Sequence, residues 1–209
     1  MNAPFETRWL GRISYEEGLR QQEGLVAQKV AGDSKNYLLL LEHEPVYTIG
    51  RTQNVSSLGN KELPYPLHRI GRGGQATYHG PGQLVAYPII DLTLVGRDLH
   101  RYLRLLEEVI IQTLALYQIK GSRREGMTGV WTDDRKIASL GVGVKKWISF
   151  HGLALNVCGD LAPFQEITPC GLSGVEMTSM KKESPTLPSL SVMEISEQLT
   201  KIFEKLLES

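Results

Sequence analysis

Cys170 and Lys136 are the two residues whose types best suit bond-making chemistry. Cys170 lies in the stretch I-T-P-C-G-L, between a proline and a glycine, in a segment without a regular pattern. A free cysteine is more often a small buried apolar side chain, but reactive cysteines occur at partly exposed loop positions. Because a thiol with a pKa of about 8.5 is only slightly ionised at neutral pH, a nucleophilic Cys170 needs a positive charge nearby.

Lys136 is the basic residue best suited to supply that charge. It begins the stretch K-I-A-S-L-G, whose small residues leave room for a ligand or for close backbone approach. At about 4 Å and an effective dielectric constant near 20, one ammonium group favours a thiolate by roughly 4 kcal/mol before desolvation. The alternative is a solvated lysine at the start of a strand. The second cysteine, Cys158, follows the apolar stretch L-A-L-N-V and is predicted to be structural.

The segment from Arg72 to Tyr87 is the densest group of ligand-binding residue types. It reads R-G-G-Q-A-T-Y-H-G-P-G-Q-L-V-A-Y. Glycine is used where the backbone takes a positive φ or closely approaches another group. Arg72, Gln75, His79 and Gln83 place donors and acceptors beside that backbone. The segment is therefore predicted to be a ligand-lined loop that leads into a strand.

The five histidines give no metal-binding pattern. His79 and His151, in S-F-H-G-L-A, each suit a hydrogen bond to a substrate or to a backbone carbonyl, although an isolated histidine is more often structural. His43 and His68 are predicted to lie in loops, and His100 on the solvent face of a helix. No pair has HxxxH spacing, and the glycines match neither nucleotide-binding signature. We expect no metal and no cofactor.

Composition limits the class of protein. A chain of 209 residues with 41% hydrophobic residues predicts a single domain over residues 1–209. Its 23 basic and 23 acidic residues balance, which argues against a nucleic-acid partner. No apolar run approaches the length of a membrane span, which is roughly 18 residues, and residues 1–10 lack a signal-peptide core. Two cysteines make no disulfide framework, so we expect a cytoplasmic protein.

Two groups of basic residues stand out along the chain. A solvated face is the simpler explanation for both, and a docking surface for an acidic carrier protein is the alternative. The first group is Lys120, Arg123 and Arg124, and the second is Arg135, Lys136, Lys145 and Lys146.

The elements that must position these residues alternate between helices and runs of strands. Capping residues predict helices from Ser14 to about Val30, from Asp98 to about Tyr117, and from Ser191 toward the end of the chain. Pro88 is expected near a sheet edge or a bulge. Helices that flank runs of consecutive strands predict an α+β (mixed α/β) fold. Strands are predicted at 37–41, 46–49, 84–90, 129–132, 136–144 and 147–157, a loop at 52–67 and irregular structure at 158–188.

Four blocks of this chain together resemble the lipoate-biosynthesis octanoyltransferases, also called lipoyl(octanoyl) transferases. The first two are L-E-H-E-P-V-Y-T-I-G-R at 41–51 and the Arg72–Tyr87 segment. The others are K-I-A-S-L-G at 136–141 with W-I-S-F-H-G-L-A-L-N-V at 147–157, and I-T-P-C-G-L at 167–172. The resemblance covers roughly residues 8–180. It departs where Met177 stands in place of a common valine, and in the tail after Lys182.

The resemblance implies a fold shared with biotin and lipoate protein ligases, with a central mixed sheet flanked by helices. It also implies transfer of an octanoyl group from octanoyl-acyl carrier protein to a lysine of lipoyl domains, those of 2-oxoacid dehydrogenases and of the glycine cleavage H protein. Cys170 would hold the acyl group as a thioester, and Lys136 would lower its pKa and assist proton transfer. The acyl site would be lined by Arg72, Gly73, Gly74, Gln75, Ala76, Thr77, Tyr78, His79, Ser139, Leu140, Gly141, Gly152, Leu153 and Ala154.

Three alternatives remain open from the sequence. A ligase of the same fold would activate a free acid with ATP, and the block around Cys170 speaks against it. A non-catalytic module that docks carrier or lipoyl domains would not need both Cys170 and Lys136. A cysteine hydrolase would need a histidine tied to Cys170, and no motif provides one.

Overall fold

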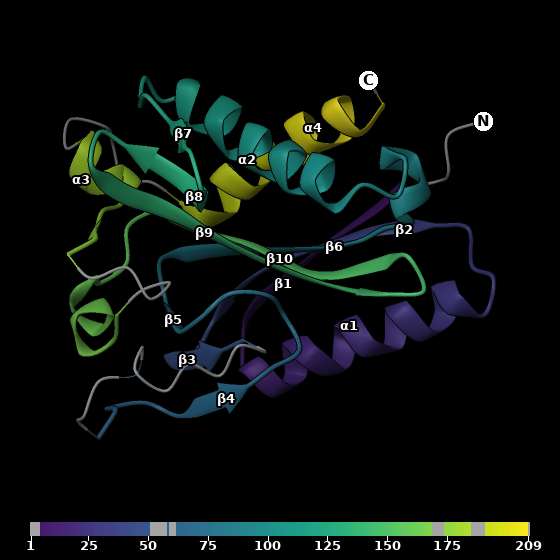
Figure 1. The fold of residues 1–209 in the computed structure, drawn as a ribbon, viewed down its shortest axis with the longest axis horizontal. Coiled ribbons are helices and arrows are strands. Elements are labelled where there is room, and N and C mark those ends of the chain that lie inside the picture. The colour runs from purple at the N-terminus through teal and green to yellow at the C-terminus, as the bar shows by residue number, and fades with distance from the viewer. Residues whose placement is uncertain (1–4, 51–57, 59–61, 169–173, 185–190, 209) are drawn as a thin grey trace.

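The computed structural model describes residues 5–50, 58, 62–168, 174–184 and 191–208. A large mixed sheet forms its centre, with the strand order β1-β2-β6-β10-β9-β8-β7 and with β11 paired to β9 (Figure 1). The β1–β2 and β11–β9 pairs are parallel and the other pairs are antiparallel. The strands are β1 (Phe5–Ile13), β2 (Asn36–His43), β6 (Gln83–Ile89), β7 (Ser122–Arg124), β8 (Met127–Thr132), β9 (Arg135–Lys145), β10 (Ile148–Asn156) and β11 (Glu176–Met177).

A second, smaller sheet has the order β4-β3-β5. It consists of β3 (Val46–Ile49), β4 (Leu67–Arg69) and β5 (Thr77–His79). The helices are α1 (Tyr15–Val30), α2 (Leu99–Ala115), α3 (Met180–Glu183) and α4 (Val192–Glu208), with 3₁₀ turns at Leu92–Val95 and Ala162–Glu166. Within the described residues, none of the helices combines the length and the apolarity that a membrane crossing requires.

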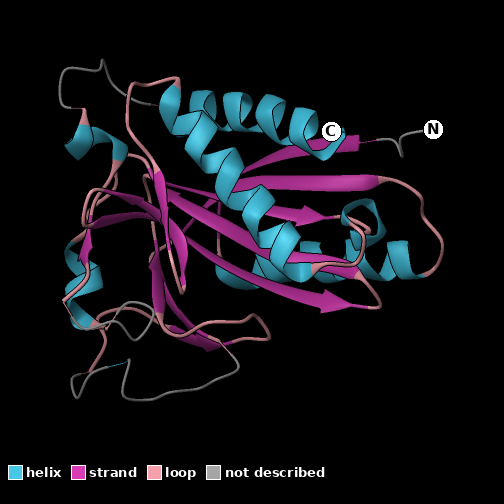
Figure 2. Ribbon diagram, turned by 45° about the horizontal axis from the view of Figure 1, so that its top comes forward, coloured by secondary structure: helices cyan, strands magenta, loops and turns pink. Residues whose placement is uncertain are grey.

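Helices α2 and α4 cover one face of the large sheet, which we call the α2/α4 face (Figures 1 and 2). Helix α2 begins where predicted, because Asp98 Oδ1 accepts hydrogen bonds from the backbone N–H groups of His100 at 2.8 Å and Arg101 at 3.0 Å. The buried layer beneath these helices is apolar. It includes Leu106, Ile110, Leu153, Leu155, Leu199 and Phe203.

Helix α1 and the small sheet lie against the opposite face, which we call the α1 face (Figure 1). Ser14 Oγ accepts from the Glu17 N–H at 3.2 Å, so the predicted cap starts this helix. Leu25 and Val26 pack onto strand residues that include Leu39 and Tyr87. A further apolar group around Tyr47 and Tyr78 fills the space beneath the small sheet.

The structure corrects several expectations. Pro88 is in β6, an interior strand between β2 and β10, so the predicted sheet edge is wrong. Proline fits there because the paired register of β6 with β10 ends at Ala86, while on its other side Pro88 pairs with Leu38 of β2. His43 and His68 lie in β2 and β4 rather than in loops. His43 continues its strand because it pairs in parallel with Ile13.

Other segments are more ordered than the sequence indicated. Strands β1, β4, β5 and β7 have no counterpart among the predicted strands, and the segment predicted to be irregular contains β11 and α3. Most of the predicted loop at 52–67 lies outside the described residues. The remaining predicted strands and helices are confirmed, with ends that differ by a few residues.

The second basic group is not a single cluster. Arg135 and Lys136 begin β9 and Lys145 ends it, about 30 Å away at the rise of a strand. Arg135 is paired with Glu183 at 2.9 Å, and Lys136 is 1% exposed. In the first group, Arg123 pairs with Glu107 and Glu108, and Arg124 pairs with Asp134. These contacts argue against a basic docking face at either group.

Candidate active site

A small hollow of about 40 Å³ lies on the α1 face, where the small sheet meets β9 and β10. Most of the residues predicted for the acyl site line it. They are Arg72, Gly74, Gln75, Thr77, His79, Ser139, Leu140, Gly141, Gly152, Leu153 and Ala154. Residues from three separate blocks of the sequence are therefore brought to one place.

Three predicted residues do not line the hollow. Gly73 lies beside it, with its N–H bonded to Val142 O at 3.0 Å. Ala76 and Tyr78 belong to the apolar group beneath the small sheet. Alternation along β5 explains Tyr78, because Thr77 and His79 face the hollow and the residue between them points the other way.

The hollow also contains Val85, Tyr87 and His151, which were outside the predicted set. Val85 and Tyr87 are alternate residues of β6, so strand periodicity after the glycine-rich loop was the signal for them. His151 had been considered for a hydrogen bond to substrate. It adopts φ of 56°, a left-handed conformation that is costly for a residue other than glycine.

Glycines allow the strands to come this close to the loop. Gly141 and Gly152 are paired across β9 and β10. A Cβ atom at Gly141 would lie 2.7 Å from Arg72 Cδ and 3.1 Å from Gly73 O, and one at Gly152 would lie 2.7 Å from Pro88 Cδ. Such distances are too short for ordinary carbon contacts, so both positions need glycine for the Arg72 side chain and the strand to fit.

Arg72 is the charged side chain of the hollow and is 7% exposed. Its guanidinium donates through Nη2 to Thr48 Oγ1 at 2.9 Å and to Thr48 O at 3.2 Å, and through Nη1 to Gly73 O at 2.9 Å. These hydrogen bonds hold the loop against β3. They place a fixed positive charge beside the hollow.

His79, which lines the hollow, and the nearby His43 are both neutral. Burial lowers the pKa of His79 to about 3, and the adjacent His43 lowers it further. Burial also lowers the pKa of His43 to about 4. His43 Nδ1 lies 3.2 Å from Ile13 O, an acceptor, so Nδ1 carries the proton and Nε2 accepts from the Tyr87 hydroxyl at 2.8 Å. These rings therefore provide directed hydrogen bonds and no charge at neutral pH.

Lys136 faces the same side of β9 as the hollow because of one extra residue in the strand. Val130 pairs with Ala138 and Trp131 pairs with Lys136, so Ile137 is unpaired against β8. Ile137 and Ala138 both pack into the α2/α4 layer. Strict alternation from Ala138 would turn Lys136 toward that layer, and the bulge turns it to the opposite face, which Ser139 shares.

The Lys136 side chain is enclosed by β8. Its Nζ donates to Thr128 O at 3.0 Å and lies 5.5 Å from the centre of the Trp131 ring. A Cβ atom at Gly129 would lie 2.5 Å from Lys136 Cε, so that glycine provides the space for the lysine stem. The interpretation as a solvated strand-end lysine is wrong, because Lys136 is 1% exposed.

Cys170 lies outside the described residues, and the structure is informative only about the segments on either side of it. Ile167 and Met177 both pack into the apolar group beneath the small sheet. Met177 pairs with Lys136, and the Thr178 N–H donates to Lys136 O at 2.9 Å. The chain therefore joins β9 next to Lys136 shortly after Cys170.

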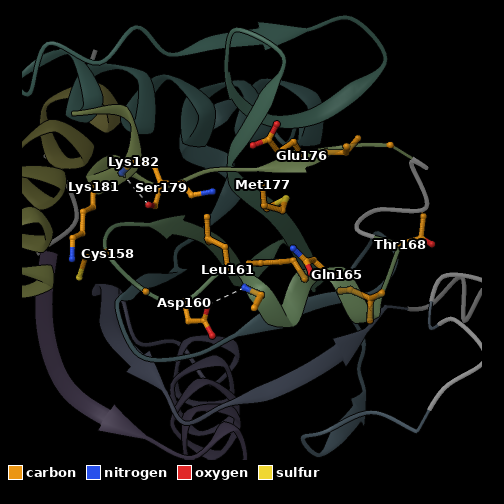
Figure 3. Close-up of a pocket in the computed structure, with 16 residues that line it drawn as sticks. Cys158, Asp160, Leu161, Gln165, Thr168, Glu176, Met177, Ser179, Lys181 and Lys182 are labelled. Carbon is orange, nitrogen blue, oxygen red and sulfur yellow. Dashed lines mark hydrogen bonds between the residues drawn. The ribbon is translucent and has the colours of Figure 1, made fainter. Parts of the chain in front are cut away.

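A larger cavity of about 910 Å³ is bounded by residues on both sides of the segment 169–173. Cys158 and Lys181 lie side by side at one end of it and Thr168 lies at the other (Figure 3). Burial raises the pKa of the Cys158 thiol, so that cysteine stays protonated at neutral pH. The glycines, Arg72 and the neutral His79 converge instead at the smaller hollow. Among the described residues, no group of three or more His, Cys, Asp or Glu side chains is arranged to hold a metal ion.

Comparison with known proteins shows a match to one family along most of the chain. The profile of the lipoyl protein ligase A/B catalytic domain matches residues 14–204. An octanoyltransferase from Geotalea uraniireducens is 49% identical over 174 residues, which cover 83% of this chain and 80% of the relative. One from Syntrophotalea carbinolica is 45% identical over 204 residues, covering 98% of this chain and 95% of the relative. The chain belongs to the octanoyltransferase branch of this family.

Solved structures with the same fold include lipoate and biotin protein ligases. A bipartite lipoate protein ligase from Thermoplasma acidophilum, studied with its E2 lipoyl domain, superimposes with a TM-score of 0.68 at 16% identity, covering all of this chain and 84% of that one. A biotin protein ligase from Aquifex aeolicus gives a TM-score of 0.58 at 14% identity, covering 97% and 69%. The predicted α+β fold of biotin and lipoate protein ligases is confirmed for this octanoyltransferase family member.

Proposed function

We propose that this protein transfers an octanoyl group from octanoyl-acyl carrier protein to the lysine amine of lipoyl domains, the first step of endogenous protein lipoylation. The observation that carries the proposal is the 45% identity to an octanoyltransferase over 98% of the chain. The geometry supports it, since an enclosed lysine and a hollow rich in donors lie on one face of β9. Residues 1–209 form one catalytic domain in this proposal.

Cys170 and Lys136 are the proposed catalytic residues. The Cys170 thiolate attacks the carbonyl carbon of the donor thioester, and the tetrahedral intermediate collapses as the bond to the carrier sulfur breaks. The leaving carrier thiolate takes a proton from the Lys136 ammonium. The neutral Lys136 then accepts a proton from the acceptor lysine amine as that amine attacks the acyl-enzyme and displaces the Cys170 thiolate. One amide is formed, and both catalytic groups regain their starting charges.

Arg72 and the backbone of the glycine-rich loop are the proposed donors to the acyl carbonyl. The positive charge of Arg72 is fixed by its hydrogen bonds to Thr48 and Gly73. Fixed donors stabilise a developing oxyanion without reorganisation, and this effect is strongest where water is excluded. Because His43 and His79 are neutral, Arg72 supplies the positive charge in this part of the site.

The apolar part of the hollow suits an alkyl chain. Val85 and Ala154 belong to the apolar layer of the α1 face and supply apolar surface there, and burying about seven methylene-sized groups contributes roughly 5 kcal/mol. The hollow itself is about 40 Å³, whereas pockets for drug-sized ligands usually measure roughly 300–1,000 Å³. Acyl binding therefore requires lining side chains to move apart.

The acceptors in this proposal are the lipoyl domains of 2-oxoacid dehydrogenases and of the glycine cleavage H protein. The presence of an E2 lipoyl domain with the Thermoplasma ligase of the same fold supports a lipoyl-domain acceptor. Acyl carrier protein as the donor remains a proposal, and so does the cytoplasmic location expected from cysteine usage.

Intact-protein mass spectrometry with octanoyl-acyl carrier protein tests the mechanism. Wild type and Cys170→Ser are each incubated with the donor, and then with a lipoyl domain. We expect one octanoyl adduct on wild type, none on Cys170→Ser, and an octanoyl amide on the lipoyl domain only with wild type. Cys158→Ser is the matched control and is expected to form the adduct, because the Cys158 thiol stays protonated.

Two outcomes would overturn the proposal. Amide formation by Cys170→Ser at the wild-type rate, with no adduct on either protein, would remove the covalent mechanism. Transfer from free octanoate that depends on ATP, without the carrier protein, would make the protein a ligase like its structural relatives.

A further inference from the structure

A buried chain of hydrogen bonds runs from Arg72 across the sheet to the strand that carries Lys136. Arg72 Nη2 donates to Thr48 Oγ1 at 2.9 Å, and Thr48 Oγ1 lies 3.4 Å from His79 Nε2. His79 Nδ1 lies 2.7 Å from Gln83 Oε1. The chain continues from Gln83 Nε2 to Asn156 Oδ1 at 2.9 Å, and from Asn156 Nδ2 to Thr178 O at 2.9 Å.

The direction of every bond in this chain is fixed by its ends. A guanidinium only donates and a backbone carbonyl only accepts, so the chain begins at Arg72 and ends at Thr178 O. Asn156 must turn its amide nitrogen to Thr178 O, which leaves Oδ1 for Gln83. Gln83 Nε2 also donates to Tyr78 O at 3.2 Å, so its oxygen must face His79.

The same logic fixes the proton on His79. Because Gln83 presents an oxygen, His79 Nδ1 must carry the hydrogen, and Nε2 must be an acceptor. Thr48 Oγ1 already accepts from Arg72, so its single proton is available for Nε2. Burial keeps the ring neutral by lowering the pKa of His79. A neutral histidine with the opposite tautomer would set two acceptors, Nδ1 and Gln83 Oε1, against each other.

The far end of the chain lies next to Lys136. Thr178 accepts from Asn156 through its carbonyl and donates from its N–H to Lys136 O at 2.9 Å. Its hydroxyl donates to Glu183 at 2.5 Å, and Glu183 pairs with Arg135. Gln83, Asn156 and Thr178 are 5%, 3% and 0% exposed, so water does not replace a lost partner easily.

We propose that Gln83 and Asn156 are positioning residues that act through this chain. Their paired amides hold His79 in the Nδ1–H tautomer beside Arg72 and hold Thr178 against the backbone of Lys136. The chain thereby fixes the acyl hollow and the lysine strand in one relative position, and bonds that share a direction reinforce one another. The kinetic part of this inference rests on the proposed octanoyl transfer, whereas the tautomer of His79 does not.

The first test reads the tautomer without any substrate. Protein labelled with ¹⁵N-histidine is examined by NMR, and the His79 signals are assigned with His79→Gln. Wild type is expected to show Nδ1 protonated and Nε2 bare at pH 7. In Gln83→Met, which has a similar size but no acceptor, the population is expected to move toward Nε2–H. Thr113→Val is the matched control, because it removes another buried hydrogen bond, to Val109 O in α2, far from the chain.

The second test measures octanoyl transfer by the same variants and by Asn156→Leu. We expect kcat to fall about tenfold or more in Gln83→Met and in Asn156→Leu, and to stay within about twofold in Thr113→Val at an equal loss of thermal stability. Because the two amides act as one unit, the double variant is expected to lose little more than either single variant.

The outcomes separate cleanly. The proposed chain of hydrogen bonds would be overturned if His79 of wild type were the Nε2–H tautomer. It would also be overturned if the tautomer of His79 did not change in Gln83→Met. A kcat in Gln83→Met and Asn156→Leu no lower than in Thr113→Val would overturn the positioning role. If neither wild type nor any variant transferred an octanoyl group, the proposed function would have failed. The NMR result would still decide the direction of the hydrogen-bond chain.

Discussion

The two faces of the large sheet are made by the same strands, yet they bury different kinds of residues. On the α2/α4 face, Leu106, Ile110, Leu199 and Phe203 are each 0% exposed, and the layer is continuous and apolar. On the α1 face, the buried layer includes His43, His79, Gln83 and Tyr87, which are joined by directed hydrogen bonds. Glycine at position 141 lets the strand come close to the Arg72 side chain on this face.

This contrast separates stability from chemistry across the thickness of one sheet. Alternation gives each strand one side chain for each face, so a strand such as β10 sends Leu153 and Leu155 into the apolar layer and Asn156 into the polar chain. Substitutions on the α2/α4 face should therefore change the free energy of unfolding, and those on the α1 face should change the reaction.

The largest expected effect is on the α1 face, at Lys136. Lys136→Met should lower kcat/KM for octanoyl transfer about 10³-fold, or about 4 kcal/mol in the activation free energy, because the proton donor and acceptor is lost. The thermal midpoint should stay the same or rise, since an apolar side chain replaces a buried charge. Lys145→Met, at the exposed end of the same strand, should keep the wild-type rate. A loss of less than tenfold in Lys136→Met would contradict the proposed role.

The next effect belongs to the α2/α4 face and should be purely one of stability. Leu106→Ala should lower the free energy of unfolding by about 3 kcal/mol, because it removes buried methyl groups and leaves a cavity. The kcat of the folded variant should not change. Urea unfolding and transfer kinetics measure the two quantities. Leu99→Ala in the same helix is the control, since Leu99 is 40% exposed, and should cost less than about 0.5 kcal/mol.

The polar layer should make stability depend on pH through His43. The pKa of His43 is about 4 in the folded protein and about 6.5 when unfolded, so the unfolded state binds more protons between these values. The free energy of unfolding is therefore unaffected by His43 above about pH 6.5, and protonation of the unfolded state should lower it by about 2 kcal/mol at pH 5. Urea unfolding at pH 7 and pH 5 measures this effect. Between these pH values the free energy of unfolding of His43→Gln should fall by about 2 kcal/mol less than that of wild type. His100→Gln, on an exposed position of α2, should behave like wild type.

The smallest effect concerns the glycine that accommodates Arg72. A methyl group at Gly141 would lie 2.7 Å from Arg72 Cδ, so Gly141→Ala should displace the guanidinium from Thr48. Octanoyl transfer should fall about tenfold, or about 1.4 kcal/mol. Gly24→Ala is the control, because nothing lies within 4 Å of that position in α1, and it should raise stability slightly. Equal rates for both variants would show that the close approach is not needed for transfer.

Local signals in the sequence were sufficient for the long helices α1, α2 and α4 and for the interior strands of the large sheet. Ser14 and Asp98 cap the helices that follow them, because a cap depends only on neighbouring residues. Strands β1 and β7 lie at the two ends of the large sheet, and their pairing with β2 and β8 depends on contacts that no local pattern encodes. Strands β4 and β5 of the small sheet were missed for the same reason, whereas β3 was predicted.

The candidate site was predictable where a family motif covers it. The glycine-rich loop and the two strand motifs identified most residues of the hollow through the resemblance. Thr48 and Asn156 were missed, because their roles depend on partners 24 and 73 positions away in the sequence. The face of β9 to which Lys136 belongs was also unpredictable, because it depends on a bulge that only the register with β8 reveals.

Because Ile137 is unpaired, the alternation of side chains in β9 changes at that residue. Residues from Ala138 onward follow one alternation, and Lys136 follows the other, so the lysine and the hollow share a face only while the extra residue is present. Deleting one residue between Lys136 and Ser139 would send the ammonium into the apolar layer beneath α2, whereas a two-residue change would preserve its side. An insertion or deletion of two residues near the start of β9 would therefore keep Lys136 on the face of the hollow, and a change of one residue would move it to the other face.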